Sequence, residues 1–108
     1  GFTVVHQFVR IGAHSITAMG TILFQDLPPF VMAAGNPAEP RSINAEGLKR
    51  RGFSLDAVAA VKRAYKTLYK GGMTLDEARA RISADSALAP ELALLADFLS
   101  VPGRGIVR

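Results

Sequence analysis

Hydrophobic positions recur every six residues near the start of the chain and every three or four residues in its second half. In VRIGAHSITAMGTI, residues 9–22, aliphatic and small residues return at fixed offsets. This spacing is typical of hexapeptide repeats, which build parallel β-helices from coils of three short strands. We expect two sets of positions to point inward: 5, 11 and 17, which are β-branched, and 9, 15 and 21, which are small or β-branched.

The six-residue pattern covers one coil, residues 5–22, whereas a solenoid is stable only with about three or more stacked units. Val5 is already in step with the repeat, and no capping element precedes it. We therefore expect further coils before Gly1, the alternative being that this coil packs on another element. Gly12 follows Ile11 at a place where a tight corner favours a residue with no side chain.

From Leu23 onward the pattern predicts an exit from the coil. Pro28 and Pro29 disfavour regular strand pairing, and a short apolar strand is expected at residues 30–34. A turn at Gly35-Asn36-Pro37 and an irregular connection through Pro40 then lead to the second half of the chain.

Helix signals dominate from Asn44 onward. A short helix is expected from an Asn44 cap to Arg51, and a longer one from a Ser54 cap to Lys70. A third is expected from a capping box at Thr74 to about Ile82, and a fourth from near Pro90. The expected buried positions are Val58, Val61, Tyr65 and Leu68 in the second helix and Leu92, Leu95, Phe98 and Leu99 in the fourth. The tail from Val101 is expected to be irregular.

These patterns predict a mixed fold, in which terminal β-helix coils and an exit loop, residues 1–43, precede a C-terminal α-helical domain, residues 44–108. The 108 residues are 49% hydrophobic, which is enough for a core. Because cysteine is absent, disulfides and thiolate metal sites are excluded, and a reducing compartment is expected. The apolar runs are too short to span a membrane. A formal charge of +4 favours anionic partners only weakly, and one Gly-Arg-Gly does not indicate nucleic-acid binding.

Several motifs together resemble one enzyme family. The coil with VHQF and IGAH, the exit QDLPPFVMAAGN, the stretch NAEGLKRRGF and the ending GRGIVR resemble the end of the UDP-N-acetylglucosamine O-acyltransferases of lipid A biosynthesis. The resemblance runs from about Thr3 to Arg108. EGLKRRGF before a helix is its most specific motif, whereas hexapeptides occur in many acyltransferases.

The resemblance implies a cytoplasmic bacterial homotrimer of left-handed parallel β-helices with C-terminal helical bundles. Such an enzyme moves an (R)-3-hydroxyacyl group from acyl carrier protein to the 3-hydroxyl of UDP-N-acetylglucosamine (UDP-GlcNAc). It needs no cofactor beyond the phosphopantetheine arm of the carrier protein, and its site lies between adjacent subunits. A histidine acts as general base in the family, but neither His6 nor His14 matches it. The chain is therefore expected to be a C-terminal part that is inactive alone.

By the same resemblance, six residues match positions at the substrate site: His6, Gln7, Asn44, Glu46, Arg50 and Arg51. Arginine suits a diphosphate because its planar fork donates two hydrogen bonds to phosphate oxygens. The structural alternative is that Asn44 caps a helix, Glu46 complements its dipole and the basic residues end it. The basic residues from Lys49 to Arg51 are also candidates for steering the acidic carrier protein.

Met19 matches the position that sets the length of the acyl groove in the family. A bulky residue there closes the groove, so the resemblance implies a medium-length acyl chain such as 3-hydroxydecanoyl. The alternative is that Met19 fills a gap in the core. Pro37 departs from relatives that place histidine directly after Gly-Asn. His14 is expected to face solvent, and two histidines without a third ligand do not predict a metal site.

Two other functions compete with the acyltransferase. One is a standalone binding or assembly module without chemistry, for which a cap over Val5 would be expected. The other is a hexapeptide transferase that uses an acetyl-CoA donor, against which EGLKRRGF argues.

Overall fold

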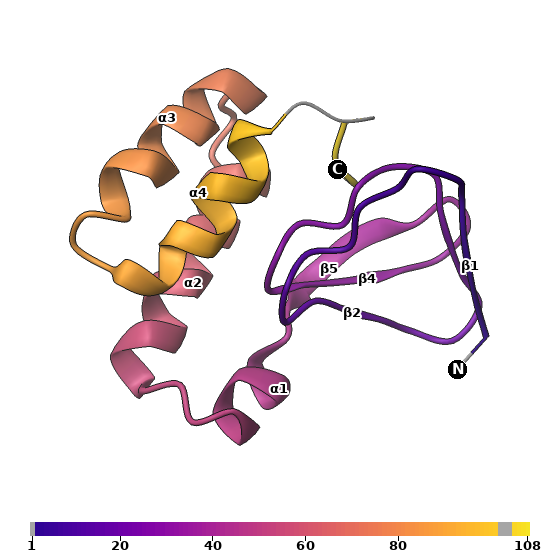
Figure 1. Ribbon diagram of the computed structural model, residues 1–108, viewed down its shortest axis with the longest axis horizontal. Helices are drawn as coiled ribbons and strands as arrows, with labels where there is room; N and C mark the ends of the chain where they lie inside the picture. Colours follow the sequence, from indigo (N-terminus) through magenta and orange to yellow (C-terminus); the bar gives the residue numbers. More distant parts are fainter. Residues whose placement is uncertain (1, 102–104) are drawn as a thin grey trace.

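The computed structural model describes residues 2–101 and 105–108 as a layer of short strands beside a group of helices. Figure 1 shows the strands on one side, helices α2, α3 and α4 together on the other, and α1 below the junction. The elements in chain order are β1 (Thr3–Val5), β2 (Ile16–Thr17), β3 (Thr21–Leu23), β4 (Val31–Ala34), β5 (Glu39–Ile43), α1 (Ala45–Arg50), α2 (Leu55–Tyr69), α3 (Leu75–Asp85), the 3₁₀ helix η1 (Pro90–Leu92) and α4 (Ala93–Ser100).

The early strands pair in parallel with strands one turn later in the chain. On one side β1 pairs with β3, so that Thr3 lies beside Thr21, eighteen residues on. On a second side β2 pairs with β4 at an offset of sixteen, Ile16 beside Met32, and an isolated bridge joins Ile11 to Leu27 at the same offset. The offset of eighteen equals three hexapeptides. The shorter offset arises between Leu23 and Leu27, where the second turn has two residues fewer than the first turn has between Val5 and Ile11. The left-handed β-helix itself stays a prediction.

Burial in the second turn of the coil shows which side chains point inward. Leu23, Leu27 and Ala33 are fully buried. Paired residues in adjacent parallel strands point to the same face, so Val5 beside Leu23 and Ile11 beside Leu27 also point inward. Val5 is nevertheless 41% exposed and Ile11 56% exposed. Ile11 borders an open hollow of about 290 Å³ at this end of the coil.

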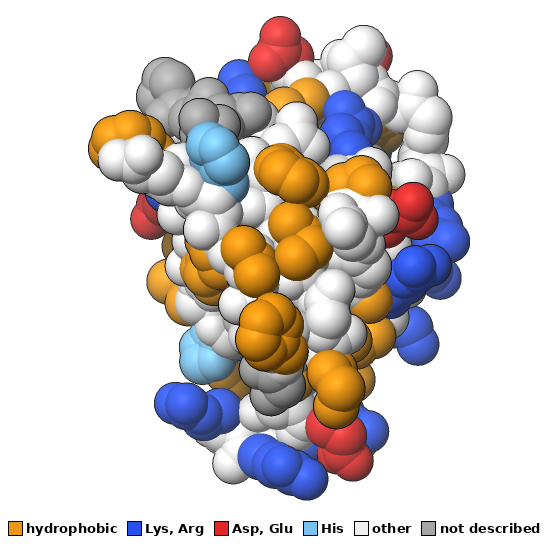
Figure 2. Space-filling view, turned by 90° about the vertical axis from the view of Figure 1, so that its right-hand side faces the viewer, with side chains coloured by type: hydrophobic (Ala, Val, Ile, Leu, Met, Phe, Trp, Pro, Cys, Tyr) orange, Lys and Arg blue, Asp and Glu red, His pale blue; other side chains and the backbone are white. Residues whose placement is uncertain are grey.

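The strand layer also exposes apolar side chains outward. Figure 2 shows the face that points away from the helices, where hydrophobic side chains form a column down the middle. The large exposed hydrophobic residues of this half, apart from the inward-pointing Val5 and Ile11, are Phe2, Val4, Phe8, Ile16, Met19 and Phe24. Exposed apolar side chains gathered on one face are typical of an interaction face.

The exit from the coil differs from its prediction. Instead of an irregular connection through Pro40, residues 39–43 form β5, which pairs antiparallel with β4. The pairing is interrupted between Met32 and Ala33 by a register shift. Pro40 is compatible with this strand because, among the described residues, β5 pairs with β4 alone, and proline is tolerated at a sheet edge.

The helix predictions are confirmed at their starts. Asn44 and Ser54 cap α1 and α2 with side-chain oxygens that accept backbone hydrogen bonds, and Thr74 with Glu77 forms a complete capping box on α3. Two ends differ from prediction: α3 continues to Asp85, and the fourth helical segment opens as η1 before α4. Of the expected buried positions, only Val58 and Phe98 are half-buried rather than buried.

Two buried clusters interlock the strand layer with the helices. Phe30 of the exit loop lies in the cluster formed mostly by the helices, and Tyr65 of α2 lies in the strand cluster. The tail was expected to be irregular, and residues 102–104 lie outside the described part. Its last residues are ordered, however: Ile106 forms a parallel bridge with Asp26, and Val107 is buried in the strand cluster.

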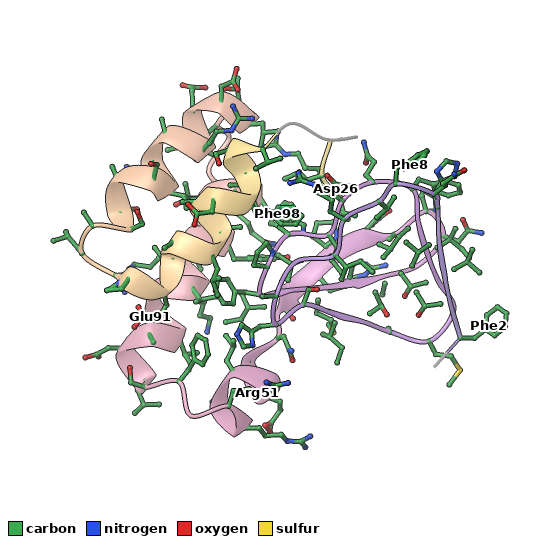
Figure 3. The ribbon with its side chains drawn as sticks, in the orientation of Figure 1. Phe2, Phe8, Asp26, Arg51, Glu91 and Phe98 are labelled. Carbon is green, nitrogen blue, oxygen red and sulfur yellow. The ribbon has the colours of Figure 1, made fainter. Side chains whose placement is uncertain are left out.

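Asp26 and Arg10 form a junction between the coil, the last helix and the tail (Figure 3). The fully buried Asp26 carboxylate accepts hydrogen bonds from the backbone N–H and the Nε of Arg10 at 2.8 and 2.9 Å. The other guanidinium nitrogens donate to the carbonyls of Phe98 and Val101. The guanidinium also lies 4.3 Å from the ring centre of Phe98, a cation–π contact.

Tyr69 makes stability sensitive to alkaline pH. Its hydroxyl donates to the carbonyl of Val107 at 2.8 Å, and burial raises the pKa of the Tyr69 phenol well above its ordinary value. Below about pH 10 the Tyr69 phenol is protonated in both the folded and the unfolded chain. Above that pH the phenol ionises in the unfolded chain while it stays protonated in the folded one. The free energy of unfolding is therefore expected to fall by up to about 1.4 kcal/mol per pH unit.

Urea unfolding between about pH 8 and about pH 11 measures this dependence. The Tyr69→Phe variant is expected to lose about 1 kcal/mol at neutral pH and to show a shallower alkaline decline than the parent chain. Equal alkaline slopes in the two proteins would contradict this role.

Candidate functional site

The N-terminus of α1 is joined to a corner of the coil by Asn44. Its Oδ1 accepts a hydrogen bond from the backbone N–H of Gly47 at 3.2 Å, which caps the helix. Its Nδ2 donates to the carbonyl oxygen of His14 at 3.1 Å. The side chain therefore fixes α1 against the coil, and the structural role that the sequence suggested for Asn44 is present.

A hollow of about 410 Å³ lies at this joint. We call it the α1 hollow, and it is lined by Ala13, His14, Ser15, Asn44, Gly47 and Arg51. Arg51 follows the last helical residue, and its backbone N–H donates to the carbonyl of Gly47. The hollow combines a guanidinium, a hydroxyl and an amide, which are groups suited to phosphate and sugar oxygens.

His14 does not face solvent as expected. Its imidazole is half-buried and stacks in parallel on the ring of Phe30, with 5.9 Å between ring centres. The ring of Phe53 meets it edge-on at 5.1 Å. His14 is therefore a packing position rather than an exposed corner, because Phe53, after α1, and Phe30, before β4, cover its ring.

Glu46 and Arg50 lie on α1 but not among the residues that line the hollow. Both are exposed and are four residues apart, so they share one face of the helix. Lys49, Arg50 and Arg51 gather at the C-terminal end of α1, where positive charge complements the helix dipole. The structure thus brings Asn44 and Arg51 together and leaves Glu46 and Arg50 on the neighbouring surface.

His6 and Gln7 belong to a different corner of the coil. Both are exposed directly after β1, and the Nδ1 of His6 lies 3.1 Å from the carbonyl oxygen of Gln7. Figure 3 shows Phe8, the next residue, at the upper right of the view and Arg51 at the bottom, well apart from each other. The six predicted residues therefore form two separate groups within one chain.

Met19 lies on the surface of the strand half. It is 80% exposed in the turn before β3, so the alternative that it fills the core of this chain is wrong. A flexible apolar side chain at such a place is available for contact with another chain or with a ligand.

Sequence reasoning missed Ser15 and Ala13 as lining residues of the α1 hollow. The only signal was their closeness in sequence to His14, and the corner conformation that aims them at α1 depends on contacts with Phe30 and Phe53. Among residues 2–101 and 105–108, no three His, Asp or Glu side chains lie close enough together to hold a metal ion.

Solved structures share this arrangement of coil and helices. A UDP-N-acetylglucosamine acyltransferase of Francisella novicida matches with a TM-score of 0.94 and 35% identity, over 98% of this chain and 39% of that one. A UDP-N-acetylglucosamine O-acyltransferase of Moraxella catarrhalis matches with a TM-score of 0.93 and 35% identity, over 98% and 41%. The fold is therefore one that occurs in acyltransferases named after the nucleotide sugar UDP-N-acetylglucosamine.

The family follows from the sequence match. The model described as UDP N-acetylglucosamine O-acyltransferase, domain 2, matches residues 26–107, and the chain belongs to this family. A curated relative from Thiobacillus denitrificans, named acyl-[acyl-carrier-protein]–UDP-N-acetylglucosamine O-acyltransferase, is 54% identical over all 108 residues. One from Pseudomonas fluorescens with the same name is 52% identical.

The chain spans 42% of the length of both relatives. The covered fractions say how much of each relative the chain matches but not which part of it. The expectation that the chain is a C-terminal part therefore stays a prediction. In the described parts of the chain, no helix is both long and apolar enough to cross a membrane.

Proposed function

We propose that the chain is part of a bacterial cytoplasmic enzyme of lipid A biosynthesis. The enzyme transfers an (R)-3-hydroxyacyl group from acyl carrier protein to the 3-hydroxyl of UDP-GlcNAc. The observation that carries this proposal is the 54% identity over the whole chain to a relative whose name contains both substrates. The α1 hollow supports it, because its groups suit a nucleotide sugar.

In this proposal Arg51 holds a phosphate of the nucleotide sugar at the α1 hollow. Its guanidinium is exposed beside the hollow and is free to form charge-assisted hydrogen bonds with phosphate oxygens. Ser15 and Asn44 line the same hollow, and Glu46 and Arg50 lie on the adjoining surface. Their separation from the lining suggests that they meet the more distant parts of the ligand.

A complete site requires more than one copy of the chain. Phe8, which directly follows His6 and Gln7, lies far from Arg51 in Figure 3. In this proposal His6 and Gln7 therefore complete the α1 hollow of a neighbouring copy rather than that of their own chain. The apolar column of the strand face in Figure 2 supplies a surface for such contacts. The proposed assembly is a homotrimer, with left-handed parallel β-helices side by side.

Neither described histidine is assigned as the general base of this reaction. The family resemblance does not match the catalytic histidine to His6 or His14, and His14 is packed between two phenylalanine rings. A base that deprotonates a sugar hydroxyl needs a ring nitrogen directed at the substrate. We propose that the catalytic histidine lies outside these 108 residues and that the chain alone has no acyltransferase activity.

The nucleotide-sugar role is tested in an enzyme that contains this chain. Arg51→Ala is expected to raise the KM for UDP-GlcNAc by roughly tenfold or more, because a hydrogen bond to a charged group contributes about 1.5–3 kcal/mol. Lys62→Ala, a cation removed from the exposed side of α2, is the control and should leave the KM unchanged. An unchanged KM in Arg51→Ala would overturn the assignment.

Met19 is proposed to limit the length of the acyl chain. Its exposed thioether side chain fills space at the surface where a neighbouring copy and the acyl group would meet. Met19→Gly is expected to shift the preference of the enzyme toward longer acyl chains, measured as relative kcat/KM for 3-hydroxydecanoyl and 3-hydroxytetradecanoyl carrier proteins. An unchanged ratio would exclude this role.

A further inference from the structure

A second hollow lies on the far side of the helical half, between α2 and the segment that joins α3 to η1. Figure 1 shows α2, α3 and α4 together in the helical half of the molecule. The hollow measures about 420 Å³, and we call it the α2 groove. It is lined by Ala60, Arg63, Lys66 and Thr67 on one wall and by Arg81, Asp85, Leu88, Ala89 and Leu92 on the other.

The α2 groove carries an excess of positive charge. Arg81 pairs with Asp85 at 3.5 Å across one turn of α3, which neutralises that wall. Arg63 and Lys66 are exposed on the opposite wall, three residues apart, and neither is in an ion pair with a described residue. Lys66 lies in the last turn of α2, where positive charge complements the helix dipole. Arg63 lies outside that turn and its charge repels that of Lys66 at this spacing, so the stability of α2 does not account for Arg63.

An apolar side chain completes the groove. Leu88 is 92% exposed on its rim, while Ala60 and Leu92 form a buried floor. The groove therefore offers an exposed leucine side chain together with two cationic side chains. These groups suit a ligand that carries two carboxylates and, between the carboxylates, a hydrophobic group. No aromatic ring lines the groove, so it lacks the stacking platform by which bases are bound.

We propose that the α2 groove docks an acidic amphipathic helix of a partner protein. Carboxylates one helical turn apart on that helix would meet Arg63 and Lys66, and an apolar side chain between them would contact Leu88. A free phosphate would use the cations alone and leave Leu88 without a role. This docking site shares no residue with the α1 hollow and does not rest on the acyltransferase proposal.

The test uses a fluorescent synthetic helical peptide with glutamates one turn apart around a leucine, titrated with a full-length protein that contains this chain. The double variant Arg63→Gln/Lys66→Gln is expected to weaken binding roughly tenfold, from two surface charge pairs. Its matched control is Lys62→Gln/Lys70→Gln, which removes the same charge from α2 and its C-cap at positions outside the groove. The control should bind within about twofold of the parent chain.

Leu88→Ser separates docking from simple charge attraction. It changes no charge and no buried side chain, so thermal melting should be unaltered while peptide binding weakens several-fold. Equal weakening by the two charge variants, or full binding by Leu88→Ser, would overturn the proposal. Groove-dependent binding to anionic lipid vesicles without binding to the peptide would also overturn it, in favour of a membrane surface.

Discussion

Asp26→Ala is expected to lower the free energy of unfolding by about 3–5 kcal/mol, which is a large part of the stability of a domain of this size. The carboxylate of Asp26 is fully buried and holds both the backbone and the side chain of Arg10. Its removal leaves a partly buried guanidinium without its counter-ion and an N–H without an acceptor. Urea unfolding monitored by circular dichroism measures the loss.

The chain contains a matched control for this experiment. Asp76 and Arg79 form an ion pair of the same length, 2.9 Å, but the Asp76 side chain is 87% exposed. Because exposed pairs contribute about 0–1 kcal/mol, Asp76→Ala should change stability little. Similar losses in the two variants would mean that burial of the Asp26 pair is not what makes it important.

Gly12→Ala is expected to cost about 3 kcal/mol, at the upper end of what overpacking does. The backbone N–H of Gly12 donates to the carbonyl of Leu27 at 2.7 Å, which draws the first turn of the coil against the second. A Cβ on Gly12 would lie 2.8 Å from the carbonyl carbon of Pro28 and closer still to the nitrogen of Pro29. These are backbone and ring atoms, which cannot rotate away.

Gly71→Ala is the control for the glycine experiment. A Cβ there would meet its nearest neighbour, the carbonyl oxygen of Thr67, at 3.4 Å, which is ordinary contact. We expect Gly71→Ala to lie within about 1 kcal/mol of the parent chain, since Gly→Ala at a compatible site changes stability by that much or less. Equal midpoints for the two variants in thermal unfolding would contradict the close approach at Gly12.

The glycine also shows what sequence reasoning missed. The sequence pattern around Ile11 indicated that glycine is needed at position 12, but the reason it suggested was a tight corner in the coil. Its actual cause is the approach of Pro28 and Pro29, sixteen or so residues later, and long-range packing of this kind leaves no local signal. The helix starts at Asn44, Ser54 and Thr74 were predictable because each cap is complete within four residues.

The candidate site likewise has one feature that was predictable from nearby residues and one that was not. The cap by Asn44 followed from its own helix, whereas the hollow that it shares with Ser15 depends on a contact thirty residues back, at the carbonyl of His14. Strand β5 was missed because Pro40 reads locally as a break, although β4 offers it a free edge. Interactions between distant segments, rather than propensities, decided each of these features.

The junction at Asp26 also ties the motions of the two halves together. Arg10 of the coil bonds to carbonyls 88 and 91 residues later, and Asp26 is bridged to the tail at Ile106. A cooperative unit in hydrogen exchange is a set of segments that cannot open separately. Fraying of α4 from the molecule would expose the Asp26 carboxylate, so protection of the amides in α4 and in the second turn of the coil is lost in one event.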